Sequence, residues 1–178
     1  MKKMVFLKSD GFTRCYCTGS KYSNFLKYAF AKADFFMLVY VNYYGKGLKK
    51  QQKYYMKRLD PFKIKRRTNP KWPGVPFTYS KNTTYKVIFY KTDTKAMEIL
   101  NEVSSLDAWS SPGNPEDLAF FIGNECWFYS VGHEKIAGFV RADCDDIEFM
   151  HQNGLLEDGV DVYKLPDYHT EYDEDLLQ

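Results

Sequence analysis

The sequence has few of the residues and motifs on which small metalloproteins, disulfide-rich proteins and nucleotide-dependent enzymes rely. Its 178 residues include only four cysteines, with no C-x-x-C pair and no histidine at zinc-finger spacing from any of them. This spacing predicts four reduced thiols rather than a disulfide framework or a zinc finger. Neither G-x-G-x-x-G nor G-x-x-x-x-G-K-[ST] occurs, so the glycine-rich loops that cradle phosphates are missing. We therefore expect no cofactor and no metal.

Long apolar runs are also missing. The most apolar stretch, residues 33–44, is rich in tyrosine and too short to span a bilayer. The apolar patch at residues 4–7 is too short for the core of a signal peptide. We expect a cytoplasmic protein with no membrane partner.

Aromatic residues, in contrast, are abundant. They make up 18% of the chain, with 15 Tyr and 14 Phe, and a disordered chain would contain few of them. The length and composition predict one folded domain over residues 1–160. The acidic residues 161–178 are expected to form a mobile C-terminal tail.

Charge is divided very unevenly along the chain. Residues 1–90 hold 20 Lys and Arg against 3 Asp and Glu, a net charge of +17, whereas residues 91–178 hold 5 against 20, a net charge of −15. The two halves either pack together and neutralise each other or present two faces to partners of opposite charge. The sequence leaves both interpretations open, and it leaves the oligomeric state open as well.

Hydrophobic periodicity predicts an α+β fold. Alternating or continuous apolar runs predict strands at residues 34–43, 62–67, 84–92, 118–122 and 126–131, with a strand pair within residues 1–18 that turns at Asp10-Gly11. Helical spacing predicts helices at residues 20–32, 48–59, 94–103 and 144–154. Ser20 or Ser23 is expected to cap the first of them, and Asp143 or Cys144 to open the last. The order of the elements favours a mixed sheet of about five to seven strands with three to four helices.

The stretch "GNPEDLAFFIGNECWFYSVGHE", residues 113–134, contains the main candidate site. His133-Glu134 suits a general acid-base pair, but Ala137 replaces the second histidine of H-E-x-x-H, so a structural or capping role is the competing interpretation. Pro115-Glu116-Asp117 suits a helix start or tight turn capped by Asn114, or else an acidic site that receives Arg or Lys from a partner.

The predicted hairpin through residues 123–124 brings these residues to one end of the sheet. The candidate binding residues are Glu116, Asp117, Trp127, His133 and Glu134, with Trp72 from a proline-rich loop at residues 68–83. His133 and Glu134 are also weak catalytic candidates.

A basic segment follows the run at residues 33–44. An amphipathic helix and a half-exposed strand carry it, and tyrosines are interleaved at residues 40–55. In the strand, Phe62 and Ile64 are expected on the inner side and the basic residues on the outer side. This composition suits a nucleic-acid surface or a solvated basic face, although no RNP, KH or helix-turn-helix signature occurs. The candidate residues are Lys49, Lys50, Lys53, Lys57, Lys63, Lys65, Arg66 and Arg67.

Three segments resemble the shared motifs of an uncharacterised family of small bacterial proteins, mostly from Firmicutes. "WPG" at residues 72–74, "PEDLAFF" at residues 115–121 and "CWFYSVGHE" at residues 126–134 carry the resemblance. Val75 departs from it, because Thr is common at that position. The resemblance implies a bacterial cytoplasmic origin, and it implies no activity and no functional residues.

Three functions compete. The first is a non-enzymatic interaction protein of the immunity or antitoxin type, whose acidic half occludes a basic surface of another protein, such as the nucleic-acid site of a toxin nuclease. The second is a nucleic-acid-binding protein that uses the basic N-terminal half. The third is a hydrolase centred on His133-Glu134.

Overall fold

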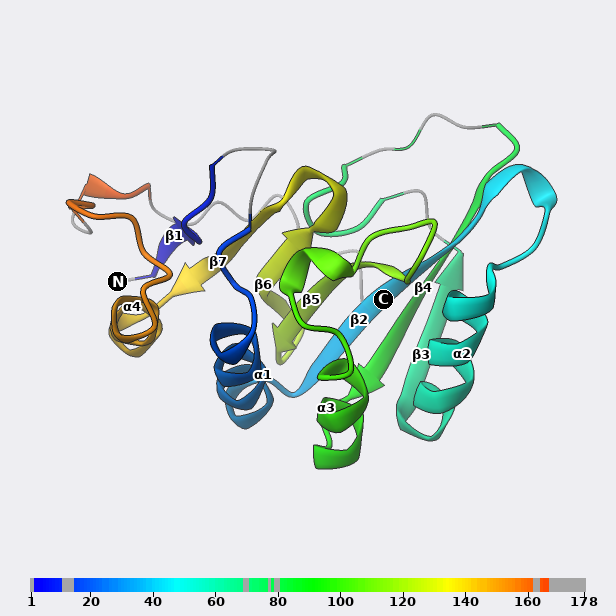
Figure 1. The fold of residues 1–178 in the computed structure, drawn as a ribbon, viewed down its shortest axis with the longest axis horizontal. Helices are drawn as coiled ribbons and strands as arrows, with labels where there is room; N and C mark the ends of the chain where they lie inside the picture. Colours follow the sequence, from blue (N-terminus) through cyan, green and yellow to red (C-terminus); the bar gives the residue numbers. More distant parts are fainter. Residues whose placement is uncertain are drawn as a thin grey trace.

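One antiparallel sheet with helices packed on it forms the fold (Figure 1). The computed structural model describes residues 2–10, 15–68, 71–76, 78, 81–161 and 164–166. The strands are β1 (Lys3–Phe6), β2 (Phe35–Asn42), β3 (Lys63–Thr68), β4 (Thr84–Lys91), β5 (Glu116–Ile122), β6 (Glu125–Val131) and β7 (Ile136–Ala142). The α-helices are α1 (Ser20–Lys32), α2 (Lys50–Leu59), α3 (Thr94–Leu100) and α4 (Cys144–Gln152). The 3-10 turns are η2 (Tyr43–Gly45), η3 (Asp60–Phe62), η4 (Leu106–Ala108) and η5 (Gly132–Glu134).

The strand order is β1-β7-β6-β5-β2-β4-β3, and each neighbouring pair is antiparallel. The predicted α+β class is therefore confirmed, but the sheet is antiparallel rather than mixed. The reason lies in the order of the strands: β4 lies between β2 and β3, so the strand-helix-strand segment over residues 35–68 does not pair its own two strands. Strands from the basic and acidic halves share this one sheet.

The central strand β2 is buried on both faces. Phe36, Leu38 and Tyr40 pack into the cluster beneath the helices, and the alternate residues of the same strand pack into a second cluster on the opposite face. Figure 1 shows α1, α3 and α2 lying across the viewed face, with α4 beside β7. Burial on both faces explains why this strand forms a continuous apolar run in the sequence.

Helix ends follow local sequence signals to different degrees. At α4, Asp143 accepts from the Asp146 backbone N–H and Asp146 accepts from the Asp143 N–H, a capping box that begins the helix where it was predicted. At α1, the expected cap by Ser20 or Ser23 is wrong, because Gly19 occupies the N-cap position and no side chain caps the helix.

The predicted faces of β3 are wrong. Ile64 was expected to face the core, but it is 58% exposed, while Lys65 and Arg67 are half-buried. β3 is an edge strand, and its register against β4 shifts between Lys63 and Lys65. The shift changes the side of the sheet on which the following residues lie.

The expected strand pair at residues 1–18 is replaced by a different arrangement. β1 pairs with β7, and within the described residues of this segment only an isolated bridge joins Ser9 to Cys15. The turn predicted at Asp10-Gly11 falls partly outside the described residues, and so does most of the predicted tail. The described residues 164–166 lie against β1, where the Met4 N–H donates to Pro166 O at 3.1 Å.

None of the helices within the described residues is long and apolar enough to cross a membrane.

Candidate functional site

A depression of about 360 Å³ opens at the ends of the inner strands, where β2 and β6 end and β4 and β5 begin. Its volume lies near the lower limit of ligand pockets, roughly 300–1,000 Å³. Three aromatic residues, a carboxylate, two hydroxyl-bearing residues, a valine and an imidazole line it: Tyr43, Trp72, Tyr85, Glu116, Ser111, Thr78, Val75 and His133. Three of the predicted binding residues, Trp72, Glu116 and His133, therefore meet in one depression.

The "WPG" motif positions the first of these residues by forming a tight turn. Trp72 and Val75 exchange backbone hydrogen bonds of 3.0 and 2.8 Å, with Pro73 second in the turn and Gly74 third at φ +85°. Proline at the second position and a positive φ at the third are the requirements of a type II turn. A Cβ on Gly74 would lie 2.7 Å from the Tyr129 ring, so glycine also permits close packing on β6. The turn leaves Trp72 only 3% exposed.

Asp117 lies beneath the depression at a bulge of β5. The register between β2 and β5 shifts between Met37 and Val39, and Asp117 takes a positive φ of 58° there. Such bulges redirect a side chain, and aspartate tolerates this backbone region better than most residues. Its carboxylate is fully buried and accepts from the Trp72 Nε1–H at 2.8 Å and the Gly132 N–H at 2.9 Å. Burial and the neighbouring charge of Glu116 raise the pKa of Asp117 to about 7, although these two hydrogen bonds act to lower it.

Glu116 belongs to the strand rather than to a helix start. The predicted helix or tight turn with an Asn114 cap is wrong, because Glu116 begins β5 and the Asn114 side chain instead donates to Ala108 O. Glu116 is 8% exposed, and its Oε1 accepts from the hydroxyls of both Tyr43 and Ser111. Its Oε2 has no hydrogen-bond partner among the described residues and remains open to the depression. Burial, along with the Glu116 charge, raises the pKa of Tyr43 to about 12.

His133 and Glu134 lie at the rim, on the 3-10 turn η5. Gly132 allows the turn to pack closely, since a Cβ there would lie 2.0 Å from Trp109 O. The His133 and Glu134 side chains are 54% and 44% exposed, and His133 Nε2 lies 3.8 Å from Glu134 Oε1. This separation exceeds hydrogen-bond length, so the two residues do not form a preassembled acid-base pair.

Trp127 lies away from this depression. It is near the start of β6, whereas Gly132 follows the end of that strand, and its ring packs into the cluster beneath the helices. Its Nε1–H donates to Asp146 Oδ2 at 3.0 Å. The prediction that the hairpin brings Trp127 to the same end as His133 is therefore wrong, because both its position along the strand and its face of the sheet differ.

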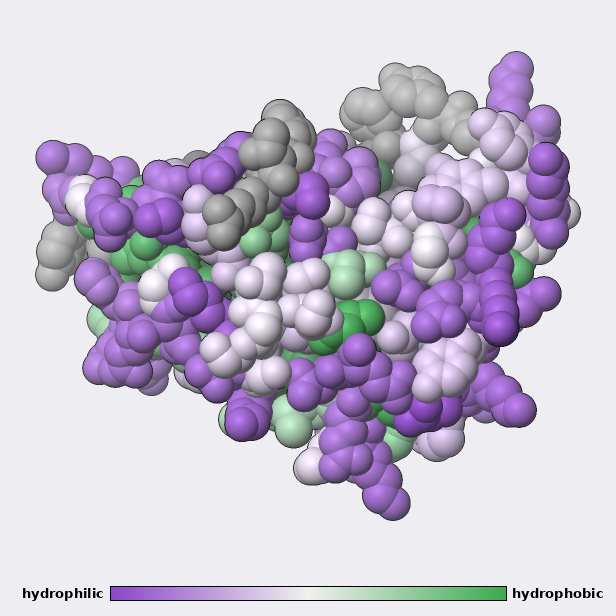
Figure 2. Space-filling model, viewed as in Figure 1, coloured by the Kyte–Doolittle hydropathy of each residue, from purple (hydrophilic) through white to green (hydrophobic). Residues whose placement is uncertain are grey.

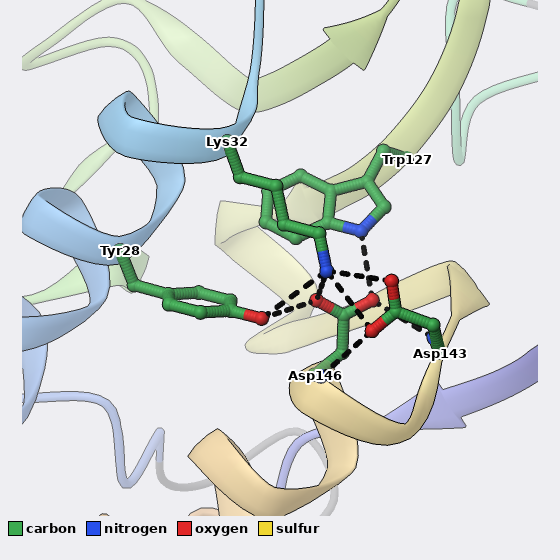
Figure 3. A network of polar contacts seen from close by, with 5 residues as sticks. All are labelled: Tyr28, Lys32, Trp127, Asp143 and Asp146. Atoms are coloured by element: carbon green, nitrogen blue, oxygen red, sulfur yellow. Dashed lines mark hydrogen bonds and ion pairs between the residues drawn. The ribbon is translucent and has the colours of Figure 1, made fainter.

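Around Trp127 lies a second polar cluster, made of Tyr28, Lys32, Trp127, Asp143 and Asp146, which the sequence did not reveal (Figure 3). The Lys32 ammonium lies 2.8 Å from Asp143 Oδ2 and 2.7 Å from Asp146 Oδ1. It also lies 5.5 Å from the ring centroids of both Tyr28 and Trp127. The Tyr28 hydroxyl donates to Asp146 Oδ1 at 2.7 Å. We call these five residues the lysine cluster.

In the lysine cluster, one ammonium faces two carboxylates. Burial disfavours the charged ammonium, but hydrogen bonds to Asp143 and Asp146 outweigh burial and raise the pKa of Lys32. Burial likewise opposes the charge of Asp143, and the bond from Lys32 outweighs it, so the pKa of Asp143 is lowered. The cluster joins α1, α4 and β6, and its contacts are those of a structural clamp.

The basic residues predicted for nucleic-acid binding lie at the β3 end of the sheet. Lys49, which precedes α2, and Lys50, Lys53 and Lys57 on the helix are all exposed. Lys63 and Arg66 on β3 are exposed too, and Figure 2 shows hydrophilic residues over α2 and over α4 at the other end of the sheet. Four ion pairs among the described residues join the two halves: Lys8–Asp158, Lys32–Asp143, Lys32–Asp146 and Arg58–Glu102. None of these four pairs uses the exposed lysines at residues 49–57, so the described part of the acidic half does not neutralise them.

Sequence reasoning missed five residues of the depression: Tyr43, Val75, Thr78, Tyr85 and Ser111. Tyr43 follows the end of β2 and Tyr85 lies near the start of β4, two strands that pair from Asn42↔Thr84 onward. Only this pairing brings the two tyrosines together. Ser111 belongs to a proline-rich turn just before β5, and its nearness to the acidic pair was the one available signal.

No protein-family model, no curated protein and no solved structure matches this chain. The resemblance to the bacterial family therefore remains a prediction. Within the described ranges, no group of three or more His, Cys, Asp or Glu residues could hold a metal ion.

Proposed function

We propose that the chain is a non-enzymatic interaction protein of the immunity or antitoxin type, which docks against a basic surface of a partner protein. The supporting observation is that Glu116, Asp117 and Glu134 gather at the same ends of the inner strands. No lysine or arginine of the described residues pairs with them. Acidic side chains that pair with no lysine or arginine of the described residues are suited to a cation from elsewhere. The immunity or antitoxin class is an analogy of type, since fold alone does not assign function.

Docking of this kind works by attraction and occlusion. The negative charge of these three residues raises the rate of encounter with a positively charged surface. The bound chain then covers that surface. A partner that uses the covered surface to bind a nucleic acid would lose access to it. This mechanism requires no bond to be made or broken by His133 or Glu134.

A capture experiment with matched charge variants tests the proposal. Wild type, Glu116→Gln/Glu134→Gln and the control Glu98→Gln/Glu157→Gln serve as bait for chemical crosslinking in cells of the source organism. Both variants lose two negative charges, but Glu98 and Glu157 lie on α3 and after α4, away from the depression. Asp117 is left intact because it is buried and holds Trp72 and Gly132.

We expect one basic protein to be captured by wild type and control and lost with the Glu116/Glu134 variant. The purified partner should then bind wild type with an affinity that falls as salt rises, and removal of the two charges should flatten that dependence. Equal capture by all three baits, or an affinity that ignores both substitutions, would overturn the proposal.

Nucleic-acid binding is the second candidate, favoured by the exposed lysines at residues 49–57 beside the basic strand β3. Neutralised phosphates release counterions, so binding should weaken steeply with salt. In filter binding of single- and double-stranded DNA and RNA, replacing Lys49, Lys50, Lys53 and Lys57 by Gln should lower the slope of log K against log salt. A shallow slope for wild type would count against this function.

A further inference from the structure

The depression and the lysine cluster are built from the same kinds of group. Each contains two acidic residues, an indole N–H that donates to an aspartate, and a tyrosine hydroxyl that donates to a carboxylate. In the lysine cluster these groups surround an ammonium (Figure 3). In the depression, hydroxyls, an indole and a backbone N–H surround the carboxylates, and no cation of the described chain lies among them.

The free acceptor of the depression points to a cationic ligand. Glu116 is 92% buried, being 8% exposed, and its Oε2 still lacks a partner among the described residues. Oε2 is not among the buried atoms without a partner, so it faces the depression, where a charged donor makes a stronger bond than a neutral one. Asp117 beneath adds negative potential in its ionised form and has both oxygens occupied, which leaves Glu116 as the contact.

The walls of the depression favour a flat, weakly hydrated cation. Trp72 and Tyr85 lie with ring centroids 5.2 Å apart and planes inclined by 43°, and Tyr43 forms a further wall. Aromatic faces attract cations, and Lys32 already lies over two such rings in the lysine cluster. A guanidinium stacks on rings and donates along its edge to a carboxylate, whereas an ammonium is a strongly hydrated point charge.

We propose that the depression formed by Tyr43, Trp72, Tyr85, Ser111, Glu116 and His133 is a receptor for an arginine side chain of the partner protein. The guanidinium donates to Glu116 Oε2 and stacks on an aromatic wall of the depression. It is the counter-charge of Glu116, as the Lys32 ammonium is the counter-charge of Asp143 and Asp146. This assignment rests on the proposed function, because it names the group by which a basic partner is held.

A short peptide tests the receptor without the partner. Acetyl-Gly-Arg-Gly-amide is titrated into the ¹⁵N-labelled full chain, and the three indole N–H signals are followed by NMR. Trp72 lines the depression, whereas Trp127 donates to Asp146 and Trp109 donates to Tyr22, so the last two indoles report unspecific binding or loss of structure. Parallel titrations use the same peptide with citrulline, which is the uncharged isostere of arginine, and with lysine.

The expected result is a saturable shift of the Trp72 indole with the arginine peptide, and none with citrulline. Glu116→Gln should weaken binding at least about tenfold, since it removes the charge from the bond but retains its shape. Glu98→Gln should change nothing. Unmoved Trp109 and Trp127 signals in Glu116→Gln would show that the variant is folded.

Three outcomes would overturn the receptor. They are equal shifts with arginine and citrulline, unchanged affinity in Glu116→Gln, and equal affinity for the lysine peptide. If the arginine peptide fails while partner capture still depends on Glu116 and Glu134, only the receptor assignment falls. If the peptide binds as expected and capture is independent of both residues, the docking function falls instead.

Discussion

Two acidic pairs lie near opposite ends of strand β6 and differ in their counter-charges. Asp146 of one pair accepts from Trp127 near the start of the strand, and Asp117 of the other accepts from Gly132 just after its end. Asp143 and Asp146 enclose the ammonium of Lys32, and their cluster joins α1 to α4. Glu116 and Asp117 have no such cation among the described residues, and one carboxylate oxygen remains open to a depression. The difference teaches that similar donors and acceptors bind an internal counter-charge at one end of the strand. At the other end they leave a carboxylate oxygen without a cation among the described residues. Five substitutions test this contrast.

Removing the internal cation should have the largest effect. Lys32→Met leaves Asp146, which is fully buried, without its ammonium, and breaking such a pair typically costs about 3 kcal/mol or more. Urea unfolding followed by circular dichroism gives the free energy of unfolding. Lys27→Met on the same helix is exposed and is the matched control, with an expected change within about 0.5 kcal/mol. Similar losses in both variants would show that the cluster is not a clamp.

Gly132→Ala should disturb the depression through its backbone. The added Cβ would lie 2.0 Å from Trp109 O, so η5 must move and the hydrogen bond from the Gly132 N–H to Asp117 lengthens or breaks. Overpacking of this kind costs about 1–3 kcal/mol. At Gly113 the nearest atom to an added Cβ lies 3.9 Å away, so Gly113→Ala should be nearly neutral in the same unfolding measurement. A neutral Gly132→Ala would mean that η5 is free to shift.

The two acidic pairs should respond to pH with opposite signs. The pKa of Asp117 is raised from 3.8 to about 7, so the folded state binds the extra proton between these values. Its contribution to stability is fully present below about pH 4 and is lost as pH rises through about 7, by up to about 1.4 kcal/mol per pH unit. The pKa of Asp143 is lowered, so its contribution is present above its unfolded pKa and is lost as pH falls.

Urea unfolding from pH 4 to 8 separates these contributions. The difference in unfolding free energy between wild type and Asp117→Asn should fall as pH rises through this range. The corresponding difference for Asp143→Asn should be smallest at the acidic end. Two differences that change in the same direction would contradict the contrast in charge balance.

Neutralising Glu116 should produce the smallest effect on stability and a clear effect on its neighbour. The Glu116 charge is one cause of the raised pKa of Asp117, second to burial, so Glu116→Gln should lower that pKa. Unfolding free energy at pH 7 should change by less than about 1 kcal/mol, because the Gln carbonyl can still accept from Tyr43 and Ser111. The midpoint of the pH-dependent Trp72 indole shift measures the change, and Glu98→Gln should leave it in place.

The elements were predictable where local periodicity and tertiary burial agree. The continuous apolar run at β2, the spacing of α1 and the Asp143 capping signal all led to elements that the fold contains. Prediction failed at β3 and at Glu116. A register shift or a bulge there changes which face of the sheet each residue of the alternating pattern lies on. Such shifts depend on the partner strand, and the partner of β3 is β4, which comes later in the chain.

The sequence by itself determined the α+β class, the buried central strand and the presence of an acidic segment near Glu116 and His133, because these follow from composition, periodicity and proximity along the chain. Only the tertiary structure decided that Trp127 joins Lys32 while Trp72 joins Asp117. It also decided that Tyr43 and Tyr85 meet Glu116. Strand order and register set these contacts, since they depend on which distant residues the sheet brings together. The same pairing placed a lysine beside one acidic pair and, within the described part of the chain, no lysine or arginine beside the other.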